Sequence, residues 1–178
     1  VSLRYSRNVD YVPEEMFLGE HGEDLMIAAV TGDSVGLHKI LQKGLRPTYQ
    51  VYVEALTANS NTIADIPRDV LTGNKGEELM LISVNDPDSY ALSTIIDMGF
   101  SPSIKLYKAA VSASGFNVRY ISKELLANDE DGEEIMIAAV TSNSYAQEAY
   151  DYLSYIKYVT PRVQEAARKN GVRVYESI

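Results

Sequence analysis

The sequence reads Gly22-Glu-Asp-Leu-Met-Ile-Ala-Ala-Val-Thr31 near its start, and nearly the same ten residues return as Gly76-Glu-Glu-Leu-Met-Leu-Ile-Ser-Val-Asn85 and Gly132-Glu-Glu-Ile-Met-Ile-Ala-Ala-Val-Thr141. The two offsets are 54 and 56 residues. Similarity over ten residues at a nearly constant spacing is typical of repeat architectures. This decapeptide therefore predicts tandem copies of one structural unit.

Weaker copies lie halfway between the strong ones. Tyr52-Val-Glu-Ala-Leu-Thr57 follows the first decapeptide, and Tyr107-Lys-Ala-Ala-Val-Ser112 follows the second. Pairs that contain small residues, such as Ala28-Ala29 and Ala109-Ala110, then recur every 27 to 29 residues. The repeating unit is thus a hairpin of about 27 to 29 residues, in which alternate copies are more alike.

Each unit is expected to contain two short helices. In the first unit, acidic residues open a helix over 23–31, Gly32-Asp33-Ser34 breaks it, and the apolar spacing from Val35 to Leu41 predicts a second helix. Gly44 and Pro47 supply the stop. The methionines of the decapeptides recur in register, which favours core packing over a ligand role.

In the even-numbered units the second helices are expected around Ile63 to Leu71 and Val118 to Ala127. Pro67 falls inside the first of these stretches, so a late or broken helix is expected there, because proline suits a first turn and not a helix interior.

The predicted fold is all-α: a solenoid of stacked antiparallel helical hairpins with five to six units. An N-terminal extension or cap is expected at 1–21, and a partial sixth repeat or C-terminal cap at 162–178. The five complete hairpins are expected at about 22–48, 49–75, 76–103, 104–131 and 132–161.

The first unit resembles the two-helix part of one ankyrin repeat in Leu25 to Asp33 and in Val35, Leu37, Ile40 to Gly44 and Pro47. The stretches 82–102 and 138–161 resemble it less closely. The Thr-Pro-Leu-His opening of that family is absent, and the unit is shorter than its usual length of about 33 residues. The resemblance implies stacked hairpins and a general tendency to bind proteins, and it transfers no individual binding residue.

Composition limits the function classes. The 178 residues are 46% hydrophobic, carry a formal charge of −9 and contain no cysteine. No apolar run approaches the roughly 18 to 20 residues that span a bilayer, so neither membrane insertion nor a secretory signal is expected. The negative charge disfavours direct binding of nucleic acid. The absence of cysteine is typical of a cytoplasmic protein, and assembly in a virion or another complex is an alternative location.

Side chains for catalysis or metal binding are few. His21 and His38 are the only histidines, and no set of nucleophile, base and orienting group emerges. The acidic stretch 128–134 lacks the alternating ligands of a calcium loop, and equivalent turns precede the other decapeptides. No enzyme activity, cofactor or metal is therefore predicted.

Tyrosine is the unusual residue, with 13 copies against three phenylalanines and no tryptophan. Several crowd the fifth hairpin, and they cannot all face one core. Exposed tyrosines are good interface anchors, although Tyr152 and Tyr155 are also suited to capping the end of a solenoid. The candidates for partner binding are Tyr145, Tyr150, Tyr155, Tyr158 and Tyr49.

The leading hypothesis is a non-catalytic module that binds a partner protein through the surface of the solenoid. One alternative is a structural or self-assembling component, viral or otherwise, that associates through its tyrosine-rich C-terminal end. Another is an acidic inhibitor that occupies a basic site on a different protein. These alternatives stay open at the level of the sequence.

Overall fold

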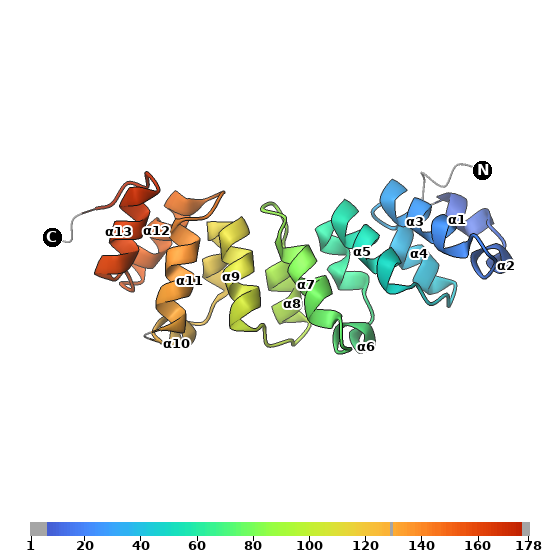
Figure 1. Ribbon diagram of the computed structural model, residues 1–178, viewed down its shortest axis with the longest axis horizontal. Coiled ribbons are helices and arrows are strands. Elements are labelled where there is room, and N and C mark those ends of the chain that lie inside the picture. Colours follow the sequence, from blue (N-terminus) through green and yellow to red (C-terminus); the bar gives the residue numbers. More distant parts are fainter. Residues whose placement is uncertain (1–6, 129, 176–178) are drawn as a thin grey trace. The chain divides into compact units, whose positions relative to one another are not determined.

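The computed structural model describes residues 7–128 and 130–175, with side chains from Val9 onward, and this part of the chain is all-helical without a β-strand. It divides into two compact units, Val1–Ser83 and Val84–Ile178. The α-helices of both are labelled in Figure 1.

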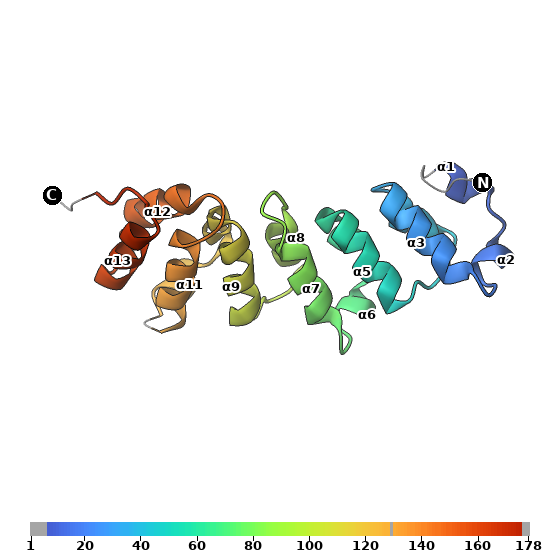
Figure 2. The same cartoon turned by 45° about the horizontal axis from the view of Figure 1, so that its top comes forward.

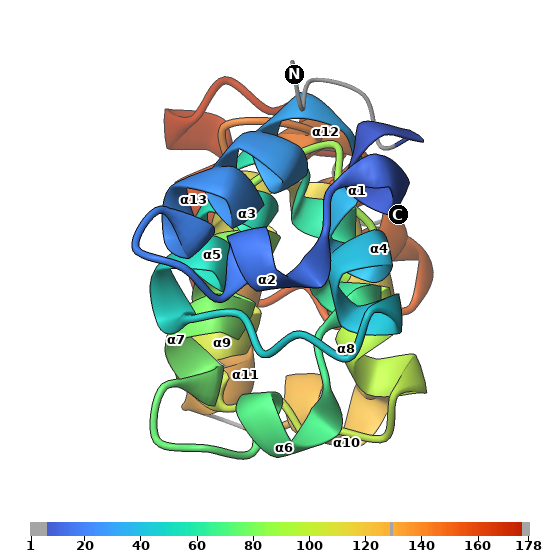
Figure 3. The same ribbon diagram turned by 90° about the vertical axis from the view of Figure 1, so that its right-hand side faces the viewer.

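The first unit is built around α3, which packs against both α4 and α5. Figure 2 shows α3 and α5 side by side, and in the view of Figure 3 the short α2 lies in front of α3 while α1 lies beside α4. The bounds are α1 Arg7–Tyr11, α2 Glu14–Phe17, α3 Gly22–Gly32, α4 Gly36–Gln42, α5 Tyr49–Ala58, the 3-10 helix η1 Ser60–Asp65, α6 Arg68–Leu71 and α7 Gly76–Val84.

The second unit is built around α11, which contacts α9, α10, α12, α13 and the 3-10 helix η2. Its core contains Ile135 and Met136 from α11, Tyr150 and Leu153 from α12, and Val163 from α13, all at most 3% exposed. The bounds are α8 Ala91–Asp97, α9 Ile104–Ala113, η2 Gly115–Tyr120, α10 Lys123–Leu126, α11 Asp131–Val140, α12 Ala146–Tyr155 and α13 Pro161–Lys169.

The three decapeptides form α3, α7 and α11, the helices that the sequence predicts for them. Met26, Met80 and Met136 are at most 7% exposed, which confirms their assignment to the core. Of each alanine pair it is the second member that is buried, as Ala29 and Ala139 are.

The first glycine of each decapeptide is a close-approach site. A Cβ atom on Gly22, Gly76 or Gly132 would lie no more than 2.5 Å from a backbone carbonyl oxygen of the short helix just before it. Those short helices are α2, α6 and α10. Only glycine lets the chain turn from the short helix into the long one at this separation.

Side chains at the helix starts tie α5 to α3 in the first unit and α13 to α11 in the second. The Thr48 hydroxyl caps α5 and donates to the Glu23 carboxylate at the start of α3. Thr160 caps α13 and donates to Glu133 Oε1 at 2.6 Å, and Arg162 pairs with the same carboxylate. The acidic residues of the decapeptide therefore bind a neighbouring helix besides complementing the dipole of their own.

The second halves of the even-numbered hairpins differ from the sequence prediction. The helix expected from Val118 to Ala127 is wrong, because η2 ends at Tyr120 and α10 begins at Lys123. The stretch from Ile63 to Leu71 is likewise divided, as Pro67 led us to expect.

A buried polar side chain explains this division. The Asn117 amide nitrogen donates to the Ala110 carbonyl oxygen at 2.9 Å, and the Thr62 hydroxyl donates to that of Ala55 at 3.1 Å. Each acceptor lies in the last turn of the preceding helix and also accepts a bond from the backbone amide of the residue that caps that helix. These bonds hold a 3-10 turn against that helix, and a new helix can begin only after it.

Candidate functional site

A cleft with aromatic walls lies within the second unit. It encloses about 330 Å³, at the small end of the roughly 300–1,000 Å³ that ligand pockets span. We call it the aromatic cleft; its lining residues are Pro87, Asp88, Ser89, Tyr90, Ser114, Phe116, Asn117, Tyr120 and Tyr145.

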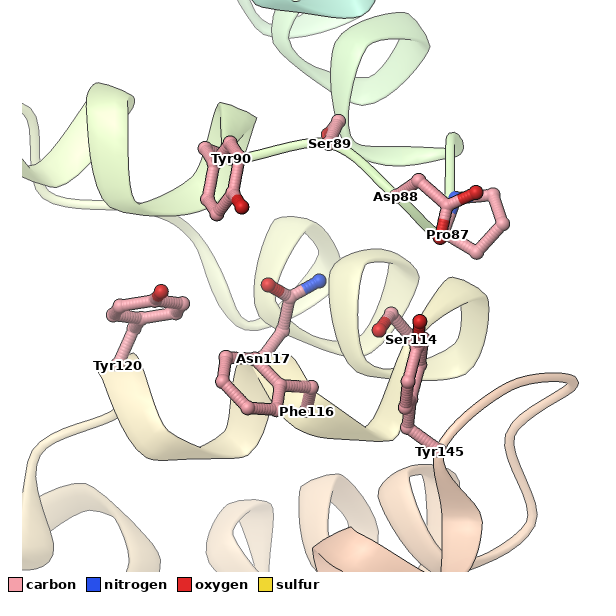
Figure 4. A pocket seen from close by; sticks show the side chains of 9 residues that line it. All are labelled: Pro87, Asp88, Ser89, Tyr90, Ser114, Phe116, Asn117, Tyr120 and Tyr145. Carbon is pink, nitrogen blue, oxygen red and sulfur yellow. The ribbon is translucent and has the colours of Figure 1, made fainter.

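Three separate segments supply these residues. Figure 4 shows the Tyr90 ring on one side of the cleft and those of Tyr120, Phe116 and Tyr145 on the other, with the buried Asn117 amide in the middle. Tyr90 precedes α8, Phe116 and Tyr120 belong to η2, and Tyr145 precedes α12. The cleft thus exists only when these segments are folded together.

The aromatic rings are arranged for mutual contact and remain open to solvent. The Phe116 ring lies 6.3 Å from that of Tyr120 and 6.3 Å from that of Tyr145, both in edge-to-face geometry. Tyr90 is 66%, Tyr145 45% and Phe116 36% exposed. A cluster of exposed aromatic rings in contact with one another is typical of a recognition surface.

Tyr145 has an unusual backbone conformation, with φ 62° and ψ 29° in the left-handed region. For a bulky residue that is not glycine this costs about 1–3 kcal/mol and persists only where neighbouring bonds enforce it. Such strain is commonly found where a side chain must be presented in one direction.

The loop before Tyr145 is held by bonds to the end of α9 and the start of η2. The Gly115 amide donates to the Ser144 carbonyl oxygen at 2.8 Å, and the Asn143 amide donates to that of Ser112 at 3.2 Å. A Cβ atom on Gly115 would lie 2.6 Å from the Tyr145 carbonyl oxygen, so the close fit needs glycine. These contacts fix the conformation of the loop and hold the Tyr145 ring beside Phe116.

The five predicted tyrosines lie in different environments. Tyr145 lines the aromatic cleft, whereas Tyr150 is 1% exposed in the core and presents no surface to a partner. Tyr155 is 85% exposed at the end of α12, and Tyr158 is half-buried against the core of the second unit. The sequence did not single out Tyr90, Phe116, Tyr120 or Asp88 as site residues.

Tyr49, the fifth candidate, lies in the first unit and makes local contacts. Its hydroxyl donates to Glu78 Oε2 at 2.8 Å, and the Lys75 ammonium lies 4.2 Å from its ring centre. The hydrogen bond to Glu78, followed by burial, raises the pKa of Tyr49 above its ordinary value of 10.0. These contacts link α5 to α7.

Tyr52 and Tyr107 lie at equivalent positions of alternate predicted hairpins, and both have a raised pKa. Burial is the main cause in each, and the Asp69 carboxylate adds to it at Tyr52. The fold therefore keeps both phenols neutral to a higher pH than that of a free tyrosine.

Replacing Tyr52 with phenylalanine is expected to remove a phenol that titrates above pH 10. Because the folded pKa is raised, the stability that the neutral phenol contributes is complete below 10.0 and is lost as pH rises through the folded value. Alkaline titration of phenolate absorbance should show one group fewer above pH 10 in Tyr52→Phe, with less alkaline loss of stability. An unchanged high-pH portion of the titration would contradict this.

The described residues include no group of three or more acidic or histidine side chains that could hold a metal ion. None of the helices in this part of the chain is both long and apolar enough to cross a membrane. Comparison with known protein families, characterised proteins and solved structures finds no match to this chain.

Proposed function

We propose that the chain is a non-catalytic protein-interaction module, an ankyrin-like solenoid of tandem helical hairpins that holds a partner protein at the aromatic cleft. The observation that carries this proposal is the grouping of Tyr90, Phe116 and Tyr145 as exposed rings around one cavity. Aromatic side chains bring large contact area at low entropic cost and dominate the binding energy of many protein interfaces.

The strained backbone of Tyr145 supports the same proposal. A residue whose conformation lowers the stability of the free protein is suited to a site that gains from presenting its ring in advance. The hydrogen bonds of the preceding loop keep the ring in place, so little conformational entropy is lost when a partner binds it. The element order also fits the proposal, because α3, α7 and α11 each open a similar run of helices.

Replacing Tyr145 with asparagine is expected to separate binding from folding. Asparagine tolerates the left-handed region, so stability should stay within about 1 kcal/mol of the unaltered protein. Loss of the aromatic anchor should reduce capture of the partner about tenfold. The measurement is affinity capture with cross-linking from the native source, together with thermal unfolding of the purified variant.

Tyr155→Ala is the matched control, since it removes an exposed tyrosine from the same region outside the cleft. It should leave capture unchanged. Equal recovery by Tyr145→Asn and the unaltered chain, or no captured protein at all, would contradict the proposed function.

A further inference from the structure

We infer that the aromatic cleft takes a basic side chain, a lysine or arginine, from the partner protein. This inference rests on the proposed function and adds the chemistry of the group that is recognised. It depends on the charge and the ring geometry of the cleft, which are separate observations from the exposure of its rings.

Of the described residues that line the cleft, Asp88 alone is charged. It is exposed, and Asp86 lies two residues before it, where its carboxylate accepts a hydrogen bond from the Asp88 amide at 3.1 Å. Among the residues that the structure describes, no lysine or arginine forms an ion pair with Asp88. The lining therefore carries one negative charge, in a chain whose formal charge is −9.

The walls suit a cation as well. The face of an aromatic ring carries partial negative charge and attracts ammonium and guanidinium groups within about 6 Å of the ring centre. Four rings, those of Tyr90, Phe116, Tyr120 and Tyr145, line a single small cavity (Figure 4). A cation that enters this cavity is surrounded by aromatic rings, and the lining also contains the Asp88 carboxylate.

The protein already uses this interaction beside the cleft. The guanidinium carbon of Arg119 lies 4.6 Å from the Phe116 ring centre and 5.6 Å from that of Tyr152. Arg119 is not among the lining residues, so it leaves the cavity open. The charge on the lining itself is therefore that of Asp88.

Small probes test the inference directly on the whole chain. The probes are N-acetyl-lysine methylamide and its arginine counterpart, with the norleucine analogue as an uncharged match and the proline analogue for a proline-rich partner. Binding is followed by nuclear magnetic resonance of the ring signals of Tyr90, Phe116 and Tyr145. The two cationic probes are expected to bind at least about fivefold more tightly than norleucine.

Asp88→Asn is expected to weaken binding of the cationic probes about threefold, because it removes the charge and keeps the shape of the side chain. Asp97→Asn, an exposed carboxylate of α8 outside the cleft, is the matched control and should bind as the unaltered chain does. Circular dichroism of both variants checks that they fold.

Norleucine or proline probes that bind as tightly as the lysine probe would overturn the inference, and so would an unchanged affinity in Asp88→Asn. If that happens while Tyr145→Asn still loses its partner, the proposed function stands and only the basic ligand is wrong. If Tyr145→Asn keeps its partner, the proposed function itself fails, whatever the probes show.

Discussion

Replacing Tyr150 with alanine is expected to lower the free energy of unfolding by about 3–5 kcal/mol, the usual loss when a large aromatic side chain is removed from a core. Tyr150 is 1% exposed and lies in the core of the second unit with Leu153 and Val163. Its removal gives up the burial of the ring and leaves a cavity that the surrounding helices fill only in part.

A loss of this size is easy to measure because the whole free energy of unfolding of a native domain is only about 5–15 kcal/mol. Urea denaturation followed by circular dichroism measures it. Tyr155→Ala, on the same helix but 85% exposed, should change stability by less than about 0.5 kcal/mol. Similar losses in the two variants would contradict the positions that the structure gives them.

Replacing Gly76 with alanine is expected to destabilise the first unit by about 3 kcal/mol, at the upper end of the cost of overpacking. The added methyl group would lie far inside 3.0 Å of the Leu71 carbonyl oxygen, a separation that real side chains do not show. The obstructing atom belongs to the backbone, so α6 or α7 must shift. The higher helix propensity of alanine offsets at most about 1 kcal/mol of this destabilisation.

Gly19→Ala is the matched control in the same unit. Its new methyl group would meet backbone oxygens only at 3.6 Å, an ordinary van der Waals contact, and Gly19 is exposed. Thermal unfolding of the two variants side by side should show a clear loss for Gly76→Ala and almost none for Gly19→Ala. A stable Gly76→Ala protein would contradict the close approach of α6 and α7.

The helices of the decapeptides and the ends of α4 and α8 were predictable because their signals are local. Gly44 and Gly99 end helices with φ of 74° and 80°, in the left-handed region that favours glycine. The decapeptides begin and end α3, α7 and α11 within a residue or two of the sequence prediction. In each case the cap, the apolar spacing and the stop lie within a few turns of one another.

The 3-10 helices were not predictable in the same way. They depend on Thr62 and Asn117, whose side chains bond to carbonyl groups seven residues earlier on a different helix. The helix propensities of neighbouring residues do not predict a hydrogen bond to a different helix. Pro67 marked one of the two breaks, whereas the cap that Ser122 provides for α10 was not part of the sequence prediction.

Part of the candidate site could likewise be predicted from the sequence, and part could not. The burial of Tyr150 had a signal in the sequence, since it lies three positions before Leu153 and one after Ala149 on the apolar face of α12. Tyr155 lies five positions beyond Tyr150 and so on a different face. The aromatic cleft had no such signal, because its rings come from segments that only the folded second unit brings together.

The ties between successive helix starts have a consequence for how the protein is made. The bonds from Thr48 to Glu23 and from Thr160 to Glu133 join residues only 25 and 27 positions apart. Contacts between residues this close in sequence form quickly, because little chain entropy is lost in closing the loop. We therefore expect α5 to dock on α3, and α13 on α11, as each helix leaves the ribosome.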